Sequence, residues 1–269
     1  MRVGRTLATA YAGTAYGFLY LPILVLVVYS FNRDGVGGFP PQHWTFDWYR
    51  TLFTDSAMWT AVGNSAIVAV STAVLSMLIG FPAAYALDRY SFPGKSAFQR
   101  LVLLPLIVPG VITGISLLLL TVSSGFHLSL VTVTLGHSTA LTAVATTEIF
   151  AGLAKLDRSL EEASADLGAS RLQTLARIIL PGLRTSLLGT ALLIFTLSMD
   201  EIAVTFFLIG RENTLPLEIW SRLRRGATPE MNAIATLIFL FSVVTIFLSQ
   251  WLMTRGQTDT SFAQEGITN

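Results

Sequence analysis

Two adjacent acids, Asp200 and Glu201, interrupt an otherwise apolar stretch that runs from residue 183 to residue 209. An acid in mid-membrane costs about 2.5–3.5 kcal/mol on insertion scales, so it usually faces a cavity, a partner charge or a substrate. Carboxylates also suit an ammonium group, because they accept charge-assisted hydrogen bonds. The pair is therefore a candidate site for a transported cation. The alternative is a structural pair that meets an arginine or backbone groups at a subunit interface.

Ser198 lies two residues before Asp200 and offers a hydroxyl either to that site or to helix packing. In another apolar stretch, His137 and Glu148 lie about three helical turns apart and so share a helix face. They could form a proton relay, but we favour a structural role, with Glu148 meeting a cytoplasmic arginine.

Trp48 and Tyr49 lie in a polar segment between two apolar stretches. An aromatic face can hold a cation, whereas aromatic residues at a membrane interface more often anchor the protein among lipid headgroups. The position of Trp48 alone does not distinguish between these two roles.

Several kinds of chemistry are excluded. The chain has no cysteine, which removes disulfides, thiolate metal sites and cysteine nucleophiles. Its three histidines are scattered, and it contains neither an H-E-x-x-H nor a G-x-x-x-x-G-K-[ST] pattern. We therefore expect no catalytic residue, no metal site and no nucleotide site in this chain. The net charge of +1 argues against a nucleic-acid surface.

The composition indicates which elements must position these residues. Of the 269 residues, 52% are hydrophobic and only 12% are charged, against about 25% charged in a typical soluble domain. A helix needs about 20 apolar residues to cross the hydrocarbon core, where its backbone must satisfy its own hydrogen bonds. We predict an all-α membrane protein, a single domain over residues 1–269 with six transmembrane helices. The predicted spans are 13–31, 62–87, 101–122, 128–153, 183–209 and 234–253.

The distribution of Lys and Arg sets the predicted orientation. Most of these residues fall on the side of the N-terminus, which predicts that both termini are cytoplasmic. Arg222, Arg224 and Arg225 fall on the opposite side. Ser30-Phe31-Asn32, and not a small-residue cleavage site, follows the first apolar stretch, so we expect an uncleaved anchor.

The segment between the fourth and fifth predicted spans is the most polar part of the middle of the chain. Ser159 and Glu162 have the spacing of a capping box, which predicts a helix start, and Gly168 suits the helix stop. A second short helix from about Arg171 to Pro181 would complete a helix–turn–helix at the cytoplasmic membrane surface. Such a helix can pack into a groove of a soluble partner. It can equally be an ordinary surface helix without a partner.

This segment resembles the EAA loop of ABC importer permeases. It has Glu-Ala-Ser, three residues, Gly, nine residues, and then Ile-x-Leu-Pro, with serine in place of the second alanine. The resemblance implies a type I ABC importer permease fold and a coupling loop, residues 154–182, that docks onto a cytoplasmic ATPase. It also implies that the partner ATPase binds ATP and Mg. The residues that it assigns to coupling are Glu161, Glu162, Ala163, Ser164, Asp166, Gly168 and Pro181.

Other segments resemble permeases of spermidine/putrescine-type importers, in particular their second permease subunit. They are Ser30-Phe31-Asn32, Trp48-Tyr49, residues 195–201, Leu215-Pro216-Leu217 and residues 229–233. In that family, acids at the positions of Asp200 and Glu201 help to handle the cationic substrate, and the position of Trp48 lines the substrate entrance. The candidate substrate path therefore comprises Trp48, Ser198, Asp200 and Glu201.

One departure concerns the substrate. Permeases of this type tend to carry an acid beside the proline early in the third span, and the sequence around Pro109 has none. Putrescine, another cationic amine or an amine-bearing organic anion are therefore alternatives to spermidine.

The resulting prediction is a permease subunit of an ATP-driven importer in the bacterial cytoplasmic (inner) membrane. The resemblance implies a second homologous permease, two ATPase subunits and an external substrate-binding protein as partners. A different class of protein, a stand-alone ion-coupled carrier, would use Asp200, Glu201 and Glu148 as proton or cation sites. It leaves the helix–turn–helix unexplained.

Overall fold

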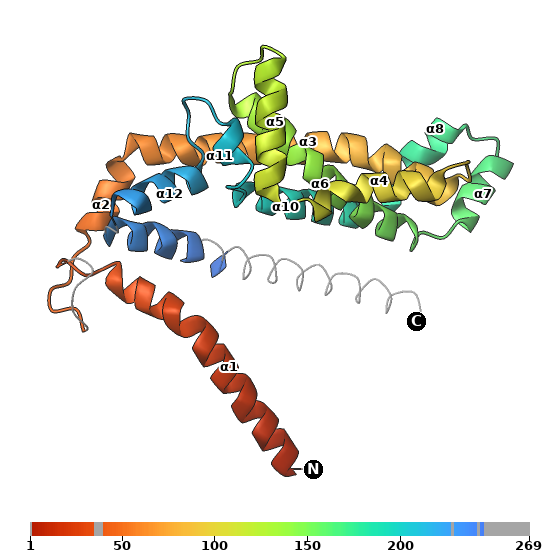
Figure 1. Cartoon of the computed structure of the whole chain (residues 1–269). Helices are drawn as coiled ribbons and strands as arrows, with labels where there is room; N and C mark the ends of the chain where they lie inside the picture. The colour runs from red at the N-terminus through yellow and green to blue at the C-terminus, as the bar shows by residue number, and fades with distance from the viewer. Residues whose placement is uncertain (1, 35–39, 227–228, 241–242, 245–269) are drawn as a thin grey trace. The chain divides into compact units, whose positions relative to one another are not determined.

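The computed structural model describes residues 2–34, 40–226, 229–240 and 243–244, which are almost entirely helical (Figure 1). The one described β feature is an isolated bridge between Asn32 and Trp44. The chain divides into two compact units, Met1–Ser56 with Ser221–Asn269, and Ala57–Trp220.

The first unit contains α1 (Arg2–Tyr29) and α2 (Asp47–Thr54), together with a helix from Pro229 to Leu240. The part of α1 from Thr9 to Tyr29 is long and apolar enough to cross a membrane. It contains residues 13–29 of the predicted span 13–31 and begins four residues before that span. The helix α12 (Leu215–Arg225) passes from one unit into the other.

The second unit is built around two long helices, α3 (Ser56–Arg89) and α6 (Leu130–Leu153). They contain nearly all of the predicted spans 62–87 and 128–153. In Figure 1, α4 (Lys95–Ile107) and α10 (Arg184–Met199) run alongside them, and α5 (Gly110–Ser123) stands across. The helix α6 packs against α4 and α10.

The predicted span 101–122 is not one continuous helix. The chain breaks between α4 and α5, which are bent by 101°. Pro109 is the physical reason: a proline disfavours helical geometry in the residue before it, and Val108 is extended, with φ −76° and ψ 126°.

The predicted span 183–209 is also broken. Its helix α10 ends at Met199, and only a short turn, α11 (Thr205–Leu208), is helical after it. The Glu201 carboxylate accepts the backbone N–H of Val204 at 2.9 Å, so a side chain takes a donor that a continuing helix would use. Asp200 and Glu201 therefore lie at a helix break and not inside a continuous helix.

The polar segment before α10 is a helix–turn–helix, as predicted. It consists of α7 (Ser159–Asp166), then α8 (Arg171–Thr174), a π-helical turn (Leu175–Ile179) and α9 (Leu180–Gly182). The helical stretch from Arg171 to Gly182 is bent by 69° from α10. Gly168 ends α7 with φ +79°, a backbone conformation that favours glycine.

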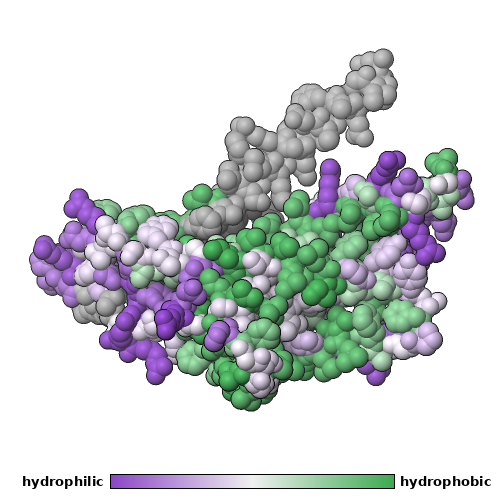
Figure 2. Space-filling model, turned by 90° about the horizontal axis from the view of Figure 1, so that it is seen from above, coloured by the Kyte–Doolittle hydropathy of each residue, from purple (hydrophilic) through white to green (hydrophobic). Residues whose placement is uncertain are grey.

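By length and composition, two described helices could cross a membrane, or four if each bent pair counts as one span. The helix α6 is not among them, although it is 24 residues long, because its middle carries histidine, serine and threonine side chains. Of the last predicted span, 234–253, only residues 234–240 and 243–244 are described. The helices of the 57–220 unit expose large apolar side chains, and Figure 2 shows a broad apolar surface on the face that it views.

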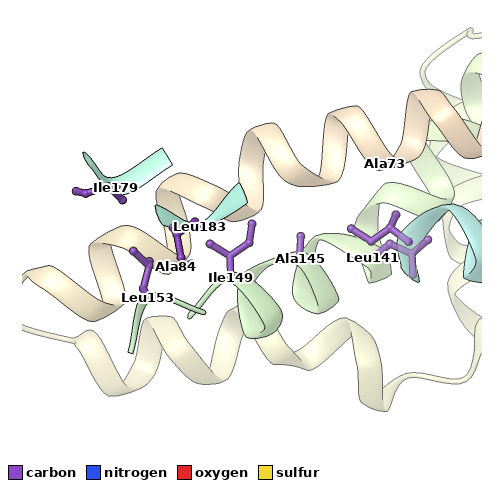
Figure 3. Close-up of a cluster of buried hydrophobic side chains, with 9 residues drawn as sticks. Ala73, Ala84, Leu141, Ala145, Ile149, Leu153, Ile179 and Leu183 are labelled. Carbon is purple, nitrogen blue, oxygen red and sulfur yellow. The ribbon is translucent and has the colours of Figure 1, made fainter. Parts of the chain in front are cut away.

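The core of this unit lies between α3, α6 and the segment that enters α10. Figure 3 shows its buried side chains, among them Ala84, Ala145, Ile149 and Leu183. A Cβ atom placed on Gly80 would lie 2.6 Å from the Ala145 Cβ and 3.0 Å from the Thr146 backbone nitrogen. Glycine therefore allows α3 and α6 to approach closely here.

We expect Gly80→Ala to destabilise the folded protein by about 1–3 kcal/mol, because the added methyl group overfills this contact. Gly63 is the matched control on the same helix, since a Cβ there meets nothing within 4 Å. Thermal unfolding in detergent would compare the two variants. A melting temperature for Gly80→Ala equal to that of Gly63→Ala would contradict the close contact.

Candidate functional site

Of the two adjacent acids, Asp200 is the one whose carboxylate could bind a ligand. It follows the last residue of α10, its side chain is exposed, and it makes no hydrogen bond or ion pair in the described part of the chain. A carboxylate at the end of a broken helix, outside regular backbone pairing, resembles the way transporters form ion and substrate sites.

Glu201 is held by its surroundings. Besides the bond from Val204, its carbonyl oxygen accepts the Thr205 hydroxyl at 2.8 Å. A Cβ on Gly110 would lie 3.7 Å from Glu201 Oε1, which places this carboxylate beside the first turn of α5. A helix start carries partial positive charge and stabilises an anion. The contacts of Glu201 are thus those of an acid that shapes the turn, whereas Asp200 is free to meet a ligand.

Ser198 does not pair with Asp200. Its hydroxyl is buried and lies 2.8 Å from His137 Nδ1, and His137 Nε2 lies 2.8 Å from the Thr205 hydroxyl. Both ring nitrogens of His137 are therefore occupied, which agrees with the structural role favoured for it. Glu148 is exposed on α6 and does not contact His137, so the structure gives no relay between them.

Trp48 belongs to the unit of residues 1–56 and 221–269, whereas the two acids belong to the other unit. Its indole N–H donates to the Asn32 carbonyl at 2.8 Å, and the side chain is partly buried. Nearby, the ring of Phe31 lies 5.2 Å from that of Tyr49, whose hydroxyl is 2.7 Å from Ser30 Oγ. These contacts hold α2 against the end of α1. The structural role of Trp48 is therefore to join these two helices.

The segment of residues 154–182 is tied to the C-terminal end of α3 by partly buried charges. Arg89, the last residue of α3, forms ion pairs with Glu161 of α7 and with Asp88, and its Nε donates to Glu161 Oε2 at 3.2 Å. Arg158 adds a contact to Asp88 at 3.5 Å. Glu162, by contrast, is exposed, and its carboxylate makes no hydrogen bond or ion pair within the described residues. Of these two neighbouring glutamates, Glu161 ties the loop to α3 and Glu162 is exposed.

The start of α7 differs from the predicted capping box. The backbone N–H of Ser159 donates to Asp157 Oδ1 at 3.0 Å, so Asp157 takes the place expected for Glu162. The backbone and hydroxyl of Ser159 both bond to this carboxylate, which lowers the pKa of Asp157 from its usual value. The capping box predicted between Ser159 and Glu162 is wrong. A Ser170–Gln173 box instead begins α8.

Ser164, the serine at the second-alanine position, joins the two arms of the loop. It is buried, and its hydroxyl lies 2.9 Å from that of Thr174. Beside it is an open hollow of about 640 Å³. The residues that line it are Leu160, Ala163, Ser164, Leu167, Gly168, Ala169, Gln173, Arg177 and Ile178. The hollow therefore combines three predicted coupling residues with exposed leucines.

The prediction from sequence missed Arg89 and Thr205. The signal for Arg89 was an Asp-Arg pair directly after a predicted span, where opposite charges need a partner. Thr205 gave no signal, because its role depends on a histidine 68 positions away in the chain.

We expect Arg89→Ala to loosen the coupling loop, because Glu161 loses its cation and Asp88 keeps only Arg158. The loss for a fully buried pair is about 3–5 kcal/mol, which is an upper bound for this partly buried one. The measurement is proteolysis of the 154–182 segment in membrane vesicles, which should become faster. The control is the charge swap Arg89→Glu with Glu161→Arg, which should recover part of the protection. Equal proteolysis of wild type and Arg89→Ala would contradict this role.

Comparisons with known proteins identify the family. Residues 76–256 match the family described as "Binding-protein-dependent transport system inner membrane component". The chain belongs to this family. A putrescine transport system permease, PotI of Escherichia coli, is 38% identical over 90% of this chain and 89% of its own length. A spermidine/putrescine transport system permease, PotC of Haemophilus influenzae, is 36% identical over 93% and 96%.

Solved structures support the fold of this family member. A chain of a bacterial ABC transporter for the acidic polysaccharide alginate matches with a TM-score of 0.72, covering 94% of this chain and 96% of that one, at 17% identity. A chain of the MetNI methionine ABC transporter matches with a TM-score of 0.58, over 74% and 95%, at 15% identity. The fold is that of the ABC importer permeases.

Proposed function

We propose that this chain is a permease subunit of an ATP-driven polyamine importer, and that putrescine is the first substrate to test. The observation that carries this proposal is the 38% identity to a putrescine permease over nearly the whole of both chains. The exposed carboxylate of Asp200 fits the same class of substrate, because an ammonium group is what a free acid beside a transport path would bind.

We propose further that six spans place both termini in the cytoplasm and that a second, homologous permease completes the path. An external binding protein would deliver the amine, and two ATPase subunits would bind ATP and Mg. Between the ATPases and the path lies the helix–turn–helix of residues 159–182. Its outward acid, Glu162, and its hollow supply a docking surface, while Glu161 and Arg89 transmit movement of the loop to α3.

The test is uptake of labelled putrescine by cells that express the whole importer, with and without ATP depletion. We expect uptake that depends on ATP and is competed by spermidine. Uptake that survives ATP depletion but collapses with the ion gradient would favour a stand-alone carrier. Failure to transport either amine in the presence of a functional binding protein would remove the polyamine assignment.

A further inference from the structure

His137 lies in the first half of α6, opposite the break between α10 and α11. It is only 2% exposed, and its two hydroxyl partners are 4% and 0% exposed. Ser198 is the last but one residue of α10, and Thr205 is the first residue of α11. One imidazole therefore bridges the two sides of the acid-bearing turn, which we define as residues 200–204.

The hydrogen atoms of this bridge can be assigned. The Thr205 hydroxyl donates its single proton to the Glu201 carbonyl at 2.8 Å, so its oxygen is left to accept from His137 Nε2–H. In a neutral imidazole, Nδ1 then has a lone pair and accepts the Ser198 hydroxyl, so that every member of the bridge has a partner. Loss of one member leaves another buried group unsatisfied, which costs more than the bond itself contributes.

Two further contacts from α6 lie on the α11 side of the turn. The Thr132 hydroxyl lies 2.8 Å from the Leu208 carbonyl oxygen, and Gly136 packs directly against Val204 and Leu208. Both hold the α11 side. Among the side-chain hydrogen bonds described for α6, those of His137 reach the α10 side as well. Through these two hydrogen bonds, His137 joins the residues on either side of the turn.

We propose that His137 is a positioning residue that fixes the acid-bearing turn and, through it, the place where Asp200 meets the transported cation. His137 does not touch the substrate. The proposal rests on the proposed function for its transport consequence, but the position of the turn can be measured without any substrate.

The transport test uses the whole importer in membrane vesicles. His137→Leu removes both bonds, and we expect KM for putrescine to rise about tenfold, with Vmax changed by less than about twofold. His137→Gln keeps a donor near Thr205 and loses the bond to Ser198, so its effect should be smaller. Adding Ser198→Ala to His137→Gln should then change KM no further, whereas Ser198→Ala alone should raise it.

The second measurement reports on the turn directly. The chain has no cysteine, so Ile202→Cys provides a single thiol within the turn. We expect His137→Leu or His137→Gln to change its rate of modification at least about fivefold, as measured on this chain by mass spectrometry. The control Thr147→Val lies on the same helix, at an exposed position, and should leave the rate unchanged.

The two measurements separate two kinds of failure. If wild type transports no polyamine but His137 variants still change the thiol rate, the polyamine assignment fails and the positioning role stands. If the thiol rate and KM are both unchanged in His137→Leu and His137→Gln, the proposal is overturned. It is also overturned if KM stays constant while the thiol rate changes.

Discussion

Asp200→Asn is expected to reduce putrescine uptake about 100-fold without lowering the amount of protein in the membrane. A charge-assisted hydrogen bond contributes about 1.5–3 kcal/mol, and 2.8 kcal/mol corresponds to 100-fold. The side chain is exposed and makes no hydrogen bond or ion pair within the described residues, so the amide should fold as well as the acid. The measurement is initial uptake rate across a range of putrescine concentrations, normalised to the protein present.

Glu201→Gln is the matched control, because it is the same change at the next residue. Its amide oxygen can still accept the Val204 N–H, so we expect a loss of less than about tenfold. Asp200→Glu keeps the charge and should retain part of the uptake. Equal losses in Asp200→Asn and Glu201→Gln would contradict the distinction between a free acid and an acid that shapes the turn.

Glu162→Lys is expected to abolish ATP-coupled uptake while leaving the permease folded. Glu162 is exposed on α7, and surface substitutions usually change stability by no more than about 0.5 kcal/mol. A reversed charge at a docking surface, however, acts directly on the partner, because like charges brought together at an interface are strongly unfavourable. Uptake and substrate-stimulated ATP hydrolysis by the reconstituted importer should both be lost.

Glu212→Lys is the control for the charge reversal, since this acid is also exposed but lies outside the coupling loop. We expect near-normal uptake from it. Co-purification of the ATPase with each variant locates the defect, because only Glu162→Lys should lose the partner. Normal coupling in Glu162→Lys would mean that the hollow beside Ser164, and not this acid, carries the docking.

The sequence was sufficient to predict the long helices α3 and α6, because each is a long stretch with very few charged residues. The structure confirms the all-α character and the extents of α3 and α6 to within a few residues, except that α3 begins at Ser56. The breaks escaped the prediction, because hydropathy averaged over a span does not register a change of direction. Pro109 could have indicated the first break, since proline restricts the residue before it. At the second break, after Met199, the Glu201 carboxylate accepts the backbone N–H of Val204, and composition does not reveal this hydrogen bond.

The two acids of the candidate site could be predicted from the sequence, whereas the residues that hold them in place could not. Two carboxylates in an apolar stretch stand out in any sequence. Their difference comes from Gly110, Thr205 and His137, which approach from other helices and depend on the tertiary structure. The coupling loop shows the same limit: Ser159 and Glu162 have the right spacing for a capping box, but Asp157 is nearer and takes the Ser159 N–H.

The polarity of α6 has a consequence for how the protein is made. A segment that carries His137, Ser138 and several threonines gains little from entering lipid alone, and its histidine acquires its partners only from α10 and α11. Those partners are synthesised later. We therefore expect α6 to reach its final packing only after the chain beyond Thr205 has been synthesised, because its buried histidine has no hydrogen-bond partner from α10 or α11 before then.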